Sequence, residues 1–564
     1  MKKRAKAIIS FAFLGGIMVT STVMIAIPGA PPSELDGAPN TQSAADADYD
    51  PSENYMEDER ARYCGTGQPP GSTDYVREFE IPTACTNPLA IAVDYDGNPW
   101  FAESNTGRAA MFDPDTETFT EYPNPDWPVG ATSTMWGMDH AANELVWFTD
   151  DWSDSLWALN TATGQYGRIP FPKVVEDPLP QRVLAEGSQV IVNDFYGNML
   201  AFLDPNQPDS YLLAPSPVDG SVTSSFVDDG ATGSLWYTSW SFIEGSGYLV
   251  EFDYDQYAYD AATTNQVYLP PIDYVGLVEL PSAVKTPNGI TISGNGKIWI
   301  ADTSSSSLFE FDPATGVFAQ YPTADPAPSA YGNKTGIIKS PISRPYWAAT
   351  DDLGRVVFNA QTSNSLSVLD PVQQNLVEYY VPSKNPYWTD CMEPVGSGMD
   401  AAPAGVAGEG GLEVAAADNC GIAQVLDFDV YQDKIWFTEW VENKIGVVDT
   451  SVPLPFDVDL PDGHVIQASP GRTHAAGFGI VDAASEAAVA QFRPFAVSAS
   501  EYVSVSLASE PPPGAGYYAY DVVPAFHEAV ISISDDAPRG IYKILLGAQS
   551  PDVAVGKFVT AIVP

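Results

Sequence analysis

Short runs in which hydrophobic and polar residues alternate follow one another along most of the chain, and seven of these runs end alike. In each, aromatic and aliphatic residues lead to a small or polar residue and then, in most copies, to an acidic one. The runs are PWFAE (99–103), VWFTD (146–150), VIVND (190–194), LWYTS (235–239), IWIAD (298–302), VVFNA (356–360) and IWFTE (435–439). Alternation with a period of two indicates β-strands.

Each run is one strand of a larger repeat. An apolar strand with a glycine turn precedes it, as in GITISGNGK (289–297), and two more strands follow it, as in FDPATGVFAQYP (311–322). Four short strands in a unit of roughly 45 residues are typical of a β-propeller blade. Seven units predict an all-β protein with a seven-bladed β-propeller over residues 75–455. The strand VREFEIP (76–82) precedes the first unit, and we expect it to complete blade seven and close the ring.

The regions on either side of the repeat have different patterns. Residues 456–564 contain alternating strands separated by Pro and Gly turns, which predict a C-terminal immunoglobulin-like β-sandwich. Residues 31–74 are rich in Pro and acidic residues and are expected to form a disordered stalk. Residues 1–30 begin with a basic cluster, and an apolar run follows at 7–27. This pattern predicts a signal peptide or a retained signal anchor, and both imply export to the cell surface or the exterior.

The charge of the chain narrows the choice of partners. Its 564 residues include 73 acidic and 25 basic ones, which gives a formal net charge of −48. A field of this sign repels nucleic acid and anionic lipid and favours cationic surfaces. We therefore expect no nucleic-acid partner, and membrane contact only through an N-terminal anchor.

Four cysteines fit an oxidising exterior. Three pairings can be drawn, and the two local bridges Cys64–Cys85 and Cys391–Cys420 are the most economical. None of the cysteines lies in a CxxC motif or near a histidine at ligand spacing, so the pattern does not indicate a zinc site.

The last position of the seven runs is the first candidate site. It is acidic in five copies, and the shared repeat position should place these carboxylates on one face of the ring; they are Glu103, Asp150, Asp194, Asp302 and Glu439. In one interpretation each accepts hydrogen bonds from backbone donors of a neighbouring strand and ties blades together. In the other they form a site for Mg²⁺ or Ca²⁺, which prefer oxygen ligands.

Tryptophans make up the second candidate site. They follow the repeated strands or lie in the connections between blades, so they should gather on the face that carries the long connections 322–345 and 383–420; they are Trp127, Trp136, Trp152, Trp240, Trp388 and Trp440. Such side chains suit a small molecule, a glycan or a surface protein, although they could also simply pack the loops onto the blades. The segment 253–266 is expected to be a long turn on the opposite face.

The stretches IWFTEWVENKIGVVD (435–449) and PNGITISGNGKIWIAD (287–302) resemble the repeats of the streptogramin B lyase (virginiamycin B lyase) family. The resemblance covers roughly residues 76–450 and implies a seven-bladed propeller. It also implies a Mg²⁺-dependent elimination that opens a cyclic depsipeptide, with a histidine as general base. Asn288 occupies the position of that histidine here, and blade seven begins Cys420-Gly421-Ile422. His140 lies inside a strand, where a packing role is expected.

These patterns favour an exported surface protein that binds a ligand or partner on the face carrying the connections. Two alternatives are a Mg²⁺-dependent, lyase-like enzyme that opens a lactone or ester by elimination, and a structural component of the cell envelope. Propeller folds serve many functions, so the fold alone does not choose among them.

Overall fold

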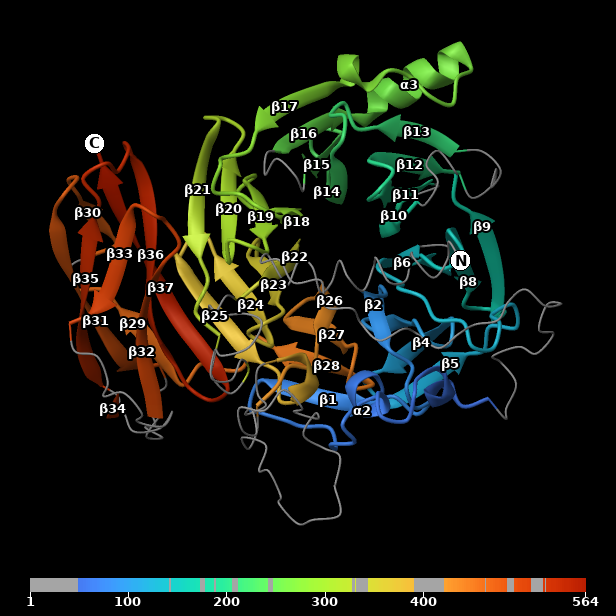
Figure 1. Ribbon diagram of the computed structural model, residues 1–564, viewed down its shortest axis with the longest axis horizontal. Helices are drawn as coiled ribbons and strands as arrows, with labels where there is room; N and C mark the ends of the chain where they lie inside the picture. The colour runs from blue at the N-terminus through green and yellow to red at the C-terminus, as the bar shows by residue number, and fades with distance from the viewer. Residues whose placement is uncertain are drawn as a thin grey trace, which may run out of the picture.

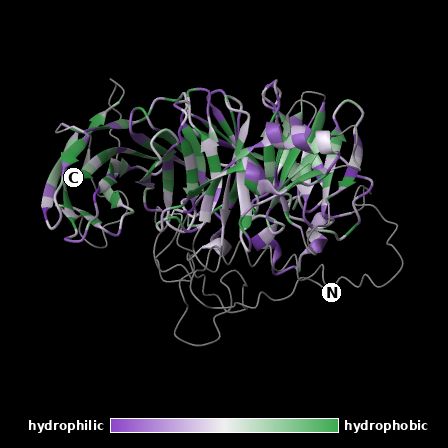
Figure 2. Cartoon of the chain, turned by 90° about the horizontal axis from the view of Figure 1, so that it is seen from above, coloured by the Kyte–Doolittle hydropathy of each residue, from purple (hydrophilic) through white to green (hydrophobic). Residues whose placement is uncertain are grey.

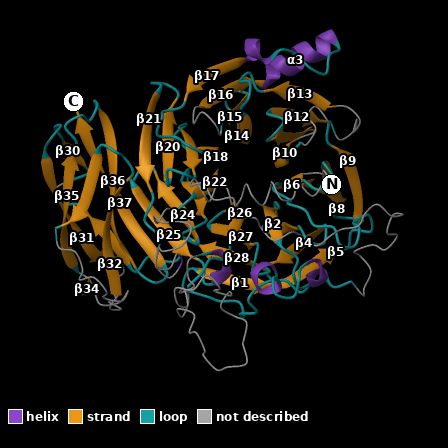
Figure 3. Cartoon of the chain, viewed as in Figure 1, coloured by secondary structure: helices purple, strands orange, loops and turns teal. Residues whose placement is uncertain are grey.

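The computed structural model describes residues 49–141, 144–172, 178–186, 189–204, 211–241, 247–326, 330, 343–389, 420–461, 463–483, 491–508, 521–522 and 524–564. Within these residues the chain forms seven antiparallel blades around a common centre, so the predicted seven-bladed propeller is confirmed (Figure 1). Figure 2 shows hydrophobic residues concentrated in the strands, and Figure 3 shows how few helices interrupt them.

The first strand of each blade is the innermost, and contacts between first strands join neighbouring blades. Blades one to three consist of β2 (Pro88–Val93), β3 (Pro99–Glu103), β4 (Arg108–Asp113) and β5 (Thr118–Tyr122); β6 (Met138–Ala141), β7 (Leu145–Asp150), β8 (Ser155–Asn160) and β9 (Gln165–Pro170); and β10 (Pro180–Glu186), β11 (Gln189–Asp194), β12 (Met199–Leu203) and β13 (Tyr211–Pro215).

Blades four to six continue in the same order. They consist of β14 (Val222–Asp229), β15 (Ser234–Trp240), β16 (Gly247–Asp253) and β17 (Val275–Glu279); β18 (Pro287–Ile292), β19 (Ile298–Asp302), β20 (Ser307–Asp312) and β21 (Val317–Pro322); and β22 (Pro345–Thr350), β23 (Val356–Ala360), β24 (Ser365–Asp370) and β25 (Asn375–Tyr380). The pairing of the first two strands is irregular near the start of the first strand in six blades. Such bulges bend the strand and increase its twist.

Blade seven is assembled from both ends of the propeller sequence. It contains β26 (Val425–Tyr431), β27 (Lys434–Glu439) and β28 (Lys444–Asp449), and its outer strand is β1 (Val76–Glu80). β1 pairs antiparallel with β28 from Val76 opposite Val448 to Glu80 opposite Lys444. The predicted closure by residues 76–82 is therefore confirmed.

The strands after blade seven form two sheets that share one hydrophobic core. The strands are β29 (Phe456–Asp459), β30 (Val465–Gln467), β31 (Thr473–Asp482), β32 (Gln491–Ser498), β33 (Val503–Leu507), β34 (Asp521–Val522), β35 (Ala525–Ile533), β36 (Gly540–Gln549) and β37 (Val553–Val563). One sheet has the order β29-β31-β35-β33; the other contains β37, β36, β32 and β34, with β30 parallel to β37. The immunoglobulin-like class of this region stays a prediction.

The C-terminal strands are joined to the propeller by backbone pairing, which the sequence did not indicate. β37 pairs antiparallel with β25, the outer strand of blade six, from Asn375 opposite Lys557 to Tyr379 opposite Val553. Blade six and the second C-terminal sheet are therefore one continuous nine-stranded sheet, seen at the left of Figure 1. The pairing covers a sheet edge that would otherwise be exposed.

The expectation of a disordered stalk over 31–74 is wrong for residues 49–74, which we call the N-terminal segment. It contains the short helices η1 (Pro51–Asn54) and α2 (Arg60–Tyr63) and packs on blades one and seven. Asn54 donates to Asn105, the Tyr55 hydroxyl donates to Asn87, and Thr66 donates to Glu442. These long-range bonds order a polar sequence whose composition alone favours disorder. Residues 31–48 and the predicted signal or anchor at 1–30 lie outside the described residues.

The expectation of a long turn at 253–266 is also wrong, because residues 254–264 form the helix α3 (Tyr254–Thr264). The Asp253 side chain caps its first turn by accepting from the Gln256 amide, and Asn265 ends the helix in the left-handed conformation. Tyr257 and Ala261 are its buried residues, one turn apart. Two 3₁₀ helices, η2 (Pro271–Tyr274) and η3 (Pro386–Trp388), complete the helical elements of the described residues. No helix in this part of the chain is long and apolar enough to cross a membrane.

Candidate functional site

The five predicted carboxylates lie at the ends of the second strands and are all fully buried. Asp150 accepts hydrogen bonds from the Ser133 hydroxyl (2.7 Å), the Trp152 amide (2.9 Å) and the Trp157 indole (3.0 Å). Ser133 lies in the connection that enters blade two, and Trp152 lies in the turn that leaves β7. The carboxylate therefore holds a connection and a turn together at the edge of its own blade.

Three other acidic positions are also bonded locally. Asp302 accepts from the Lys285 amide (3.0 Å) and the Thr286 amide. Asp194 accepts from the amides of Leu179 and Gly197, both at 2.8 Å. The remaining one, Glu103, accepts from the Thr106 hydroxyl at 2.6 Å.

These bonds do not build a metal centre. Among the described residues, no group of three or more His, Cys, Asp or Glu side chains is arranged to hold a metal ion. Four of the five carboxylates, all except Glu439, instead accept hydrogen bonds from donors of the same blade or of the connection entering it. Backbone amides at these bends lack a strand partner, and a buried carboxylate that accepts from them satisfies both groups.

The ties between blades come from the residue just before the acidic position, which the sequence interpretation overlooked. Thr238 donates to the Pro287 carbonyl (2.8 Å), Asn359 to the Val425 carbonyl (2.9 Å) and Thr438 to the Leu89 carbonyl (2.6 Å). Thr149 and Asn193 make equivalent bonds to blades three and four. Each bond runs from the second strand of one blade to the first strand of the next. The signal was the Thr or Asn that recurs in five of the seven runs.

Glu439 differs from the other four carboxylates because it belongs to a buried cluster of charges. Neither of its oxygens accepts a hydrogen bond from the described residues. Its charged neighbours are Glu78, Glu442, Lys444 and Lys384. All five side chains are at least nine-tenths buried, at the junction of blades six and seven.

Two other members of this charge cluster, Glu78 and Lys444, are hydrogen-bonded. Glu78 of β1 accepts from the Gly71 amide (2.7 Å) and from the Ser383 amide (2.7 Å) and hydroxyl (2.8 Å). The Lys444 ammonium donates to the Ser383 hydroxyl at 2.7 Å and lies 3.8 Å from Glu78. The cluster therefore joins the N-terminal segment, the closing strand and the connection after blade six.

Burial shifts the pKa of two members of this cluster, Glu439 and Lys384. Burial, reinforced by the nearby Glu78 carboxylate, raises the pKa of Glu439 well above its usual range. Burial also lowers the pKa of Lys384 to about 8, because it disfavours the charged ammonium.

The free energy of unfolding is expected to fall as the pH rises from 5 to 8. Burial, with the nearby Glu121, raises the pKa of Glu103 to about 8, and the pKa of Glu439 is also raised. The folded protein thus keeps protons in this window that the unfolded chain releases, and each rise in pH favours unfolding. Lys384 acts with the opposite sign, but only above pH 8. Melting temperatures measured across this range should drop by several degrees.

A double variant distinguishes the contribution of these two carboxylates to the pH dependence from that of general charge repulsion in an acidic protein. Glu103→Gln with Glu439→Gln should reduce the slope and raise the melting temperature at pH 8. Part of the slope should remain, because burial also raises the pKa of Asp139 to about 7 and that of Glu378 to about 8. Glu57→Gln removes one charge at an exposed position and serves as the control. If the double variant keeps the slope of the wild type, burial of these two groups does not cause the effect.

Four of the six predicted tryptophans are buried and take part in packing; they are Trp127, Trp136, Trp240 and Trp440. Trp127 donates to the Ala131 carbonyl, and its ring fills the space beside Gly107, where a Cβ atom would collide with it. Trp240 donates to the Ser224 hydroxyl at 2.6 Å. Trp152, partly exposed, packs on Trp127 with ring centroids 5.6 Å apart.

Trp388 is, with Trp152, one of the two predicted tryptophans that are partly exposed. It lies in η3, on the connection after blade six. Its indole donates to the Arg62 carbonyl at 2.8 Å, and the Arg62 guanidinium lies 4.8 Å from its ring. Tyr63 meets it edge-on at 5.6 Å and stacks on Tyr55 at 4.9 Å. We call Tyr55, Arg62, Tyr63 and Trp388 the aromatic platform.

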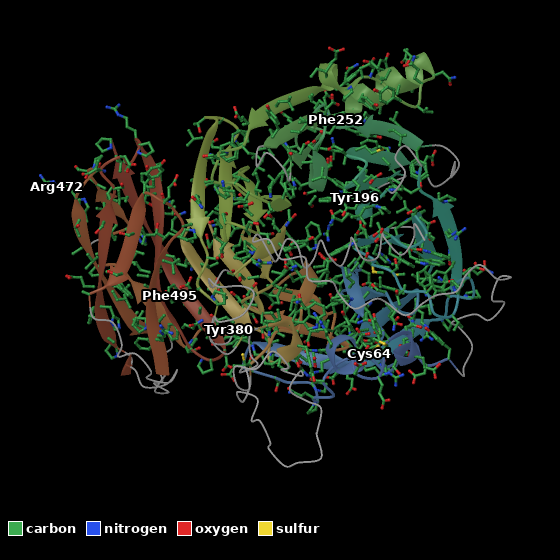
Figure 4. The ribbon with its side chains drawn as sticks, viewed as in Figure 1. Cys64, Tyr196, Phe252, Tyr380, Arg472 and Phe495 are labelled. Atoms are coloured by element: carbon green, nitrogen blue, oxygen red, sulfur yellow. A yellow bond between two sulfur atoms is a disulfide. The ribbon has the colours of Figure 1, made fainter. Side chains whose placement is uncertain are left out.

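Side chains from opposite blades meet near the centre of the ring. Arg182 of β10 forms an ion pair with Asp427 of β26 at 2.9 Å, and its guanidinium lies 4.8 Å from the Trp347 ring. Trp136 and Tyr346 lie next to each other, with ring centroids 6.4 Å apart. Figure 4 shows Tyr196 directed toward the same interior. The centre of the ring is therefore filled in part by the protein's own side chains.

The two residues considered for general-base chemistry, Asn288 and His140, both have other contacts in the fold. Asn288, at the position of the family's histidine, is buried and donates to the Thr303 hydroxyl at 2.6 Å. An amide cannot accept a proton at neutral pH and cannot act as general base. His140 lies beside Tyr95 and Trp100, and burial lowers its pKa.

The predicted Cys64–Cys85 disulfide is confirmed, with a Cα–Cα distance of 4.3 Å. It fixes the end of α2 to the connection that enters blade one, and so places the aromatic platform. Cys420 is also disulfide-bonded, and its predicted partner, Cys391, lies outside the described residues.

The described geometry is that of a closed seven-bladed β-propeller whose strand-end carboxylates are mostly bonded within the blades. No model of a known protein family and no curated protein matches the chain. Solved structures do match. A streptogramin B lyase is 16% identical, with 66% of this chain and 97% of that chain covered and a TM-score of 0.46. Virginiamycin B lyase from Staphylococcus aureus is 14% identical, with 66% and 98% covered and a TM-score of 0.46.

A structure described as YCF48 bound to D1 peptide is 9% identical, with 67% of this chain and 98% of that chain covered and a TM-score of 0.42. The chain is thus similar to lyase structures and to a structure with a bound peptide. Identities this low say nothing about activity.

Proposed function

We propose that the protein is an exported binding protein that holds a ligand or partner on the propeller face formed by the connections between blades. Export is supported by the basic and apolar residues at the N-terminus and by the Cys64–Cys85 disulfide, since such bridges persist in oxidising compartments.

The aromatic platform is the observation that carries this proposal. Its rings come from two distant parts of the sequence and are fixed by a disulfide, a stacked ring pair and a hydrogen bond. A rigid, partly exposed indole beside a guanidinium suits the apolar face of a sugar, a planar ring or a protein side chain. Little ordering would be required when such a partner binds, because the side chains are already held in place.

Replacement of Trp388 tests this proposal. A glycan array and a library of short peptides, both probed with the labelled full chain, should identify ligands. Trp388→Ala should weaken their binding at least tenfold. Trp152→Ala removes another partly exposed indole, outside the platform, and should bind like the wild type. Equal binding by wild type and Trp388→Ala would place the site elsewhere, and no binding to any probe would favour a structural role in the envelope.

A cation titration separates binding from lyase-like catalysis. Most of the predicted acidic positions already accept hydrogen bonds, so millimolar Mg²⁺ or Ca²⁺ should shift the melting temperature by less than about 1 °C. The wild type and the double variant Asp302→Asn with Glu439→Gln should respond alike. A rise that only the wild type shows would reveal a cation site and revive the enzymatic alternative.

A further inference from the structure

Apart from Arg182, which is paired with Asp427 near the centre of the ring, the sector formed by blades three and four contains no basic residue. Between Arg182 and Lys285 the sequence has fourteen Asp and Glu residues and no Lys, Arg or His. A stretch this long with charges of one sign creates a local field stronger than the average of the acidic chain. The sector should therefore attract positive charge and repel a second copy of the protein.

The rim of this sector also exposes large apolar side chains. They lie on α3, on the segment after it, on η2 and on β17, with exposed fractions of 41–67%; they are Tyr259, Val267, Tyr268, Ile272 and Leu277. We call them the rim surface. Five of the thirteen large hydrophobic residues exposed in the described chain thus fall within residues 259–277. Clusters of exposed apolar side chains often mark interaction sites.

Ring packing and hydrogen bonds beneath the rim surface hold its backbone in place. Phe252, labelled in Figure 4, packs against Tyr257 with ring centroids 5.2 Å apart, and Tyr257 donates to the Leu213 carbonyl. The Tyr274 hydroxyl donates to Asp260 at 3.0 Å, which ties η2 to α3. These contacts fix the backbone of α3 and β17, which lie at the top of Figure 1, so the apolar side chains are displayed on a preformed surface.

An open sheet edge adjoins these side chains. β17 pairs with β16 on one side only, from Val275 opposite Phe252 to Glu279 opposite Tyr248, and no described strand pairs with its other side. Its sequence, VGLVE, has none of the lysines or prolines that protect edge strands. The outer edge of blade six, by contrast, is covered by β37. An unprotected edge can accept an extended peptide through backbone hydrogen bonds.

We propose that the rim surface binds a basic, partly apolar segment of another protein, which adds as a strand to the free edge of β17. Lysines or arginines of that segment would face nearby carboxylates such as Asp255, Asp273 and Glu279, and its apolar side chains would cover the rim surface. Charge complementarity selects this occupant, because a second copy would bring a further acidic sector. This site is separate from the aromatic platform and does not depend on it.

Binding of a defined peptide tests this proposal. The probe is a fluorescent twelve-residue peptide of alternating lysine and valine, titrated with the full chain and followed by fluorescence anisotropy. It should bind, and a peptide of alternating glutamate and valine should not. Ile272→Lys with Leu277→Lys should weaken binding at least tenfold without changing the melting temperature, because both side chains are exposed.

A matched variant controls for general attraction. Leu353→Lys with Val372→Lys makes the same change of charge at two exposed apolar positions on blade six. It should bind the lysine peptide nearly as well as the wild type. Equal weakening by both double variants would mean diffuse electrostatic attraction and would overturn the proposal. The proposal would also be overturned if the lysine peptide did not bind. It would be overturned as well if the wild type self-associated and Ile272→Lys with Leu277→Lys abolished that self-association.

Discussion

Removal of residues 453–564 is expected to produce a propeller that aggregates instead of a stable shorter protein. The truncation removes β37 and leaves the whole outer edge of β25 without a partner. It also removes Phe558, whose ring meets Tyr321 edge-on at 4.9 Å, and the Tyr380 amide loses the Asp552 carbonyl at 3.0 Å. Leu376, Val377 and Tyr379 are buried in the intact chain, so the new edge would be hydrophobic as well as unpaired.

Size-exclusion chromatography with light scattering measures this effect directly. The full chain without residues 1–48 provides the control, since that deletion leaves every described strand in place. We expect the control to elute as a single species and the truncated chain to form large aggregates. A monomeric truncated chain that melts like the control would show that the C-terminal sheets are an independent attachment.

Deletion of residues 74–82 is the second change with a large expected effect. It removes the outer strand of blade seven together with the buried side chains Tyr75, Val76 and Ile81. Burial of one such side chain contributes about 1.5–3 kcal/mol, so three approach the total stability of many domains, about 5–15 kcal/mol. The deletion also removes Glu78 and leaves the Lys444 ammonium without its closest carboxylate. We expect loss of the cooperative melting transition.

A substitution on the same strand controls for this deletion. Arg77→Ala removes an exposed ion pair with Glu117, and such pairs contribute about 0–1 kcal/mol. Circular dichroism melts of this variant should match those of the wild type. A deletion variant that also melts at the wild-type temperature would contradict closure of the ring by β1.

The candidate site was only partly predictable from sequence. The repeat position identified five buried carboxylates, and the structure places all five at equivalent strand ends. The repeat pattern could not show whether the carboxylate oxygens already accept hydrogen bonds. The donors lie in connections between strands, and the paths of these connections depend on the fold. The same limit applies to Trp127 and Trp388: both lie in connections, yet one is packed beside Gly107 and the other belongs to the aromatic platform.

The blade repeat and the closing strand could be predicted from the sequence, which also favoured the Cys64–Cys85 pair among three possible pairings. These features depend on alternation of period two, on recurrence and on short separations between cysteines, all of which are local properties of the chain. Only the tertiary structure decided that the N-terminal segment is ordered, that β37 completes the edge of blade six and that Glu439 lies among buried charges. Each of these three features depends on contacts between sheet edges or polar groups that come together only after folding. The residues that make these contacts are far apart in the sequence.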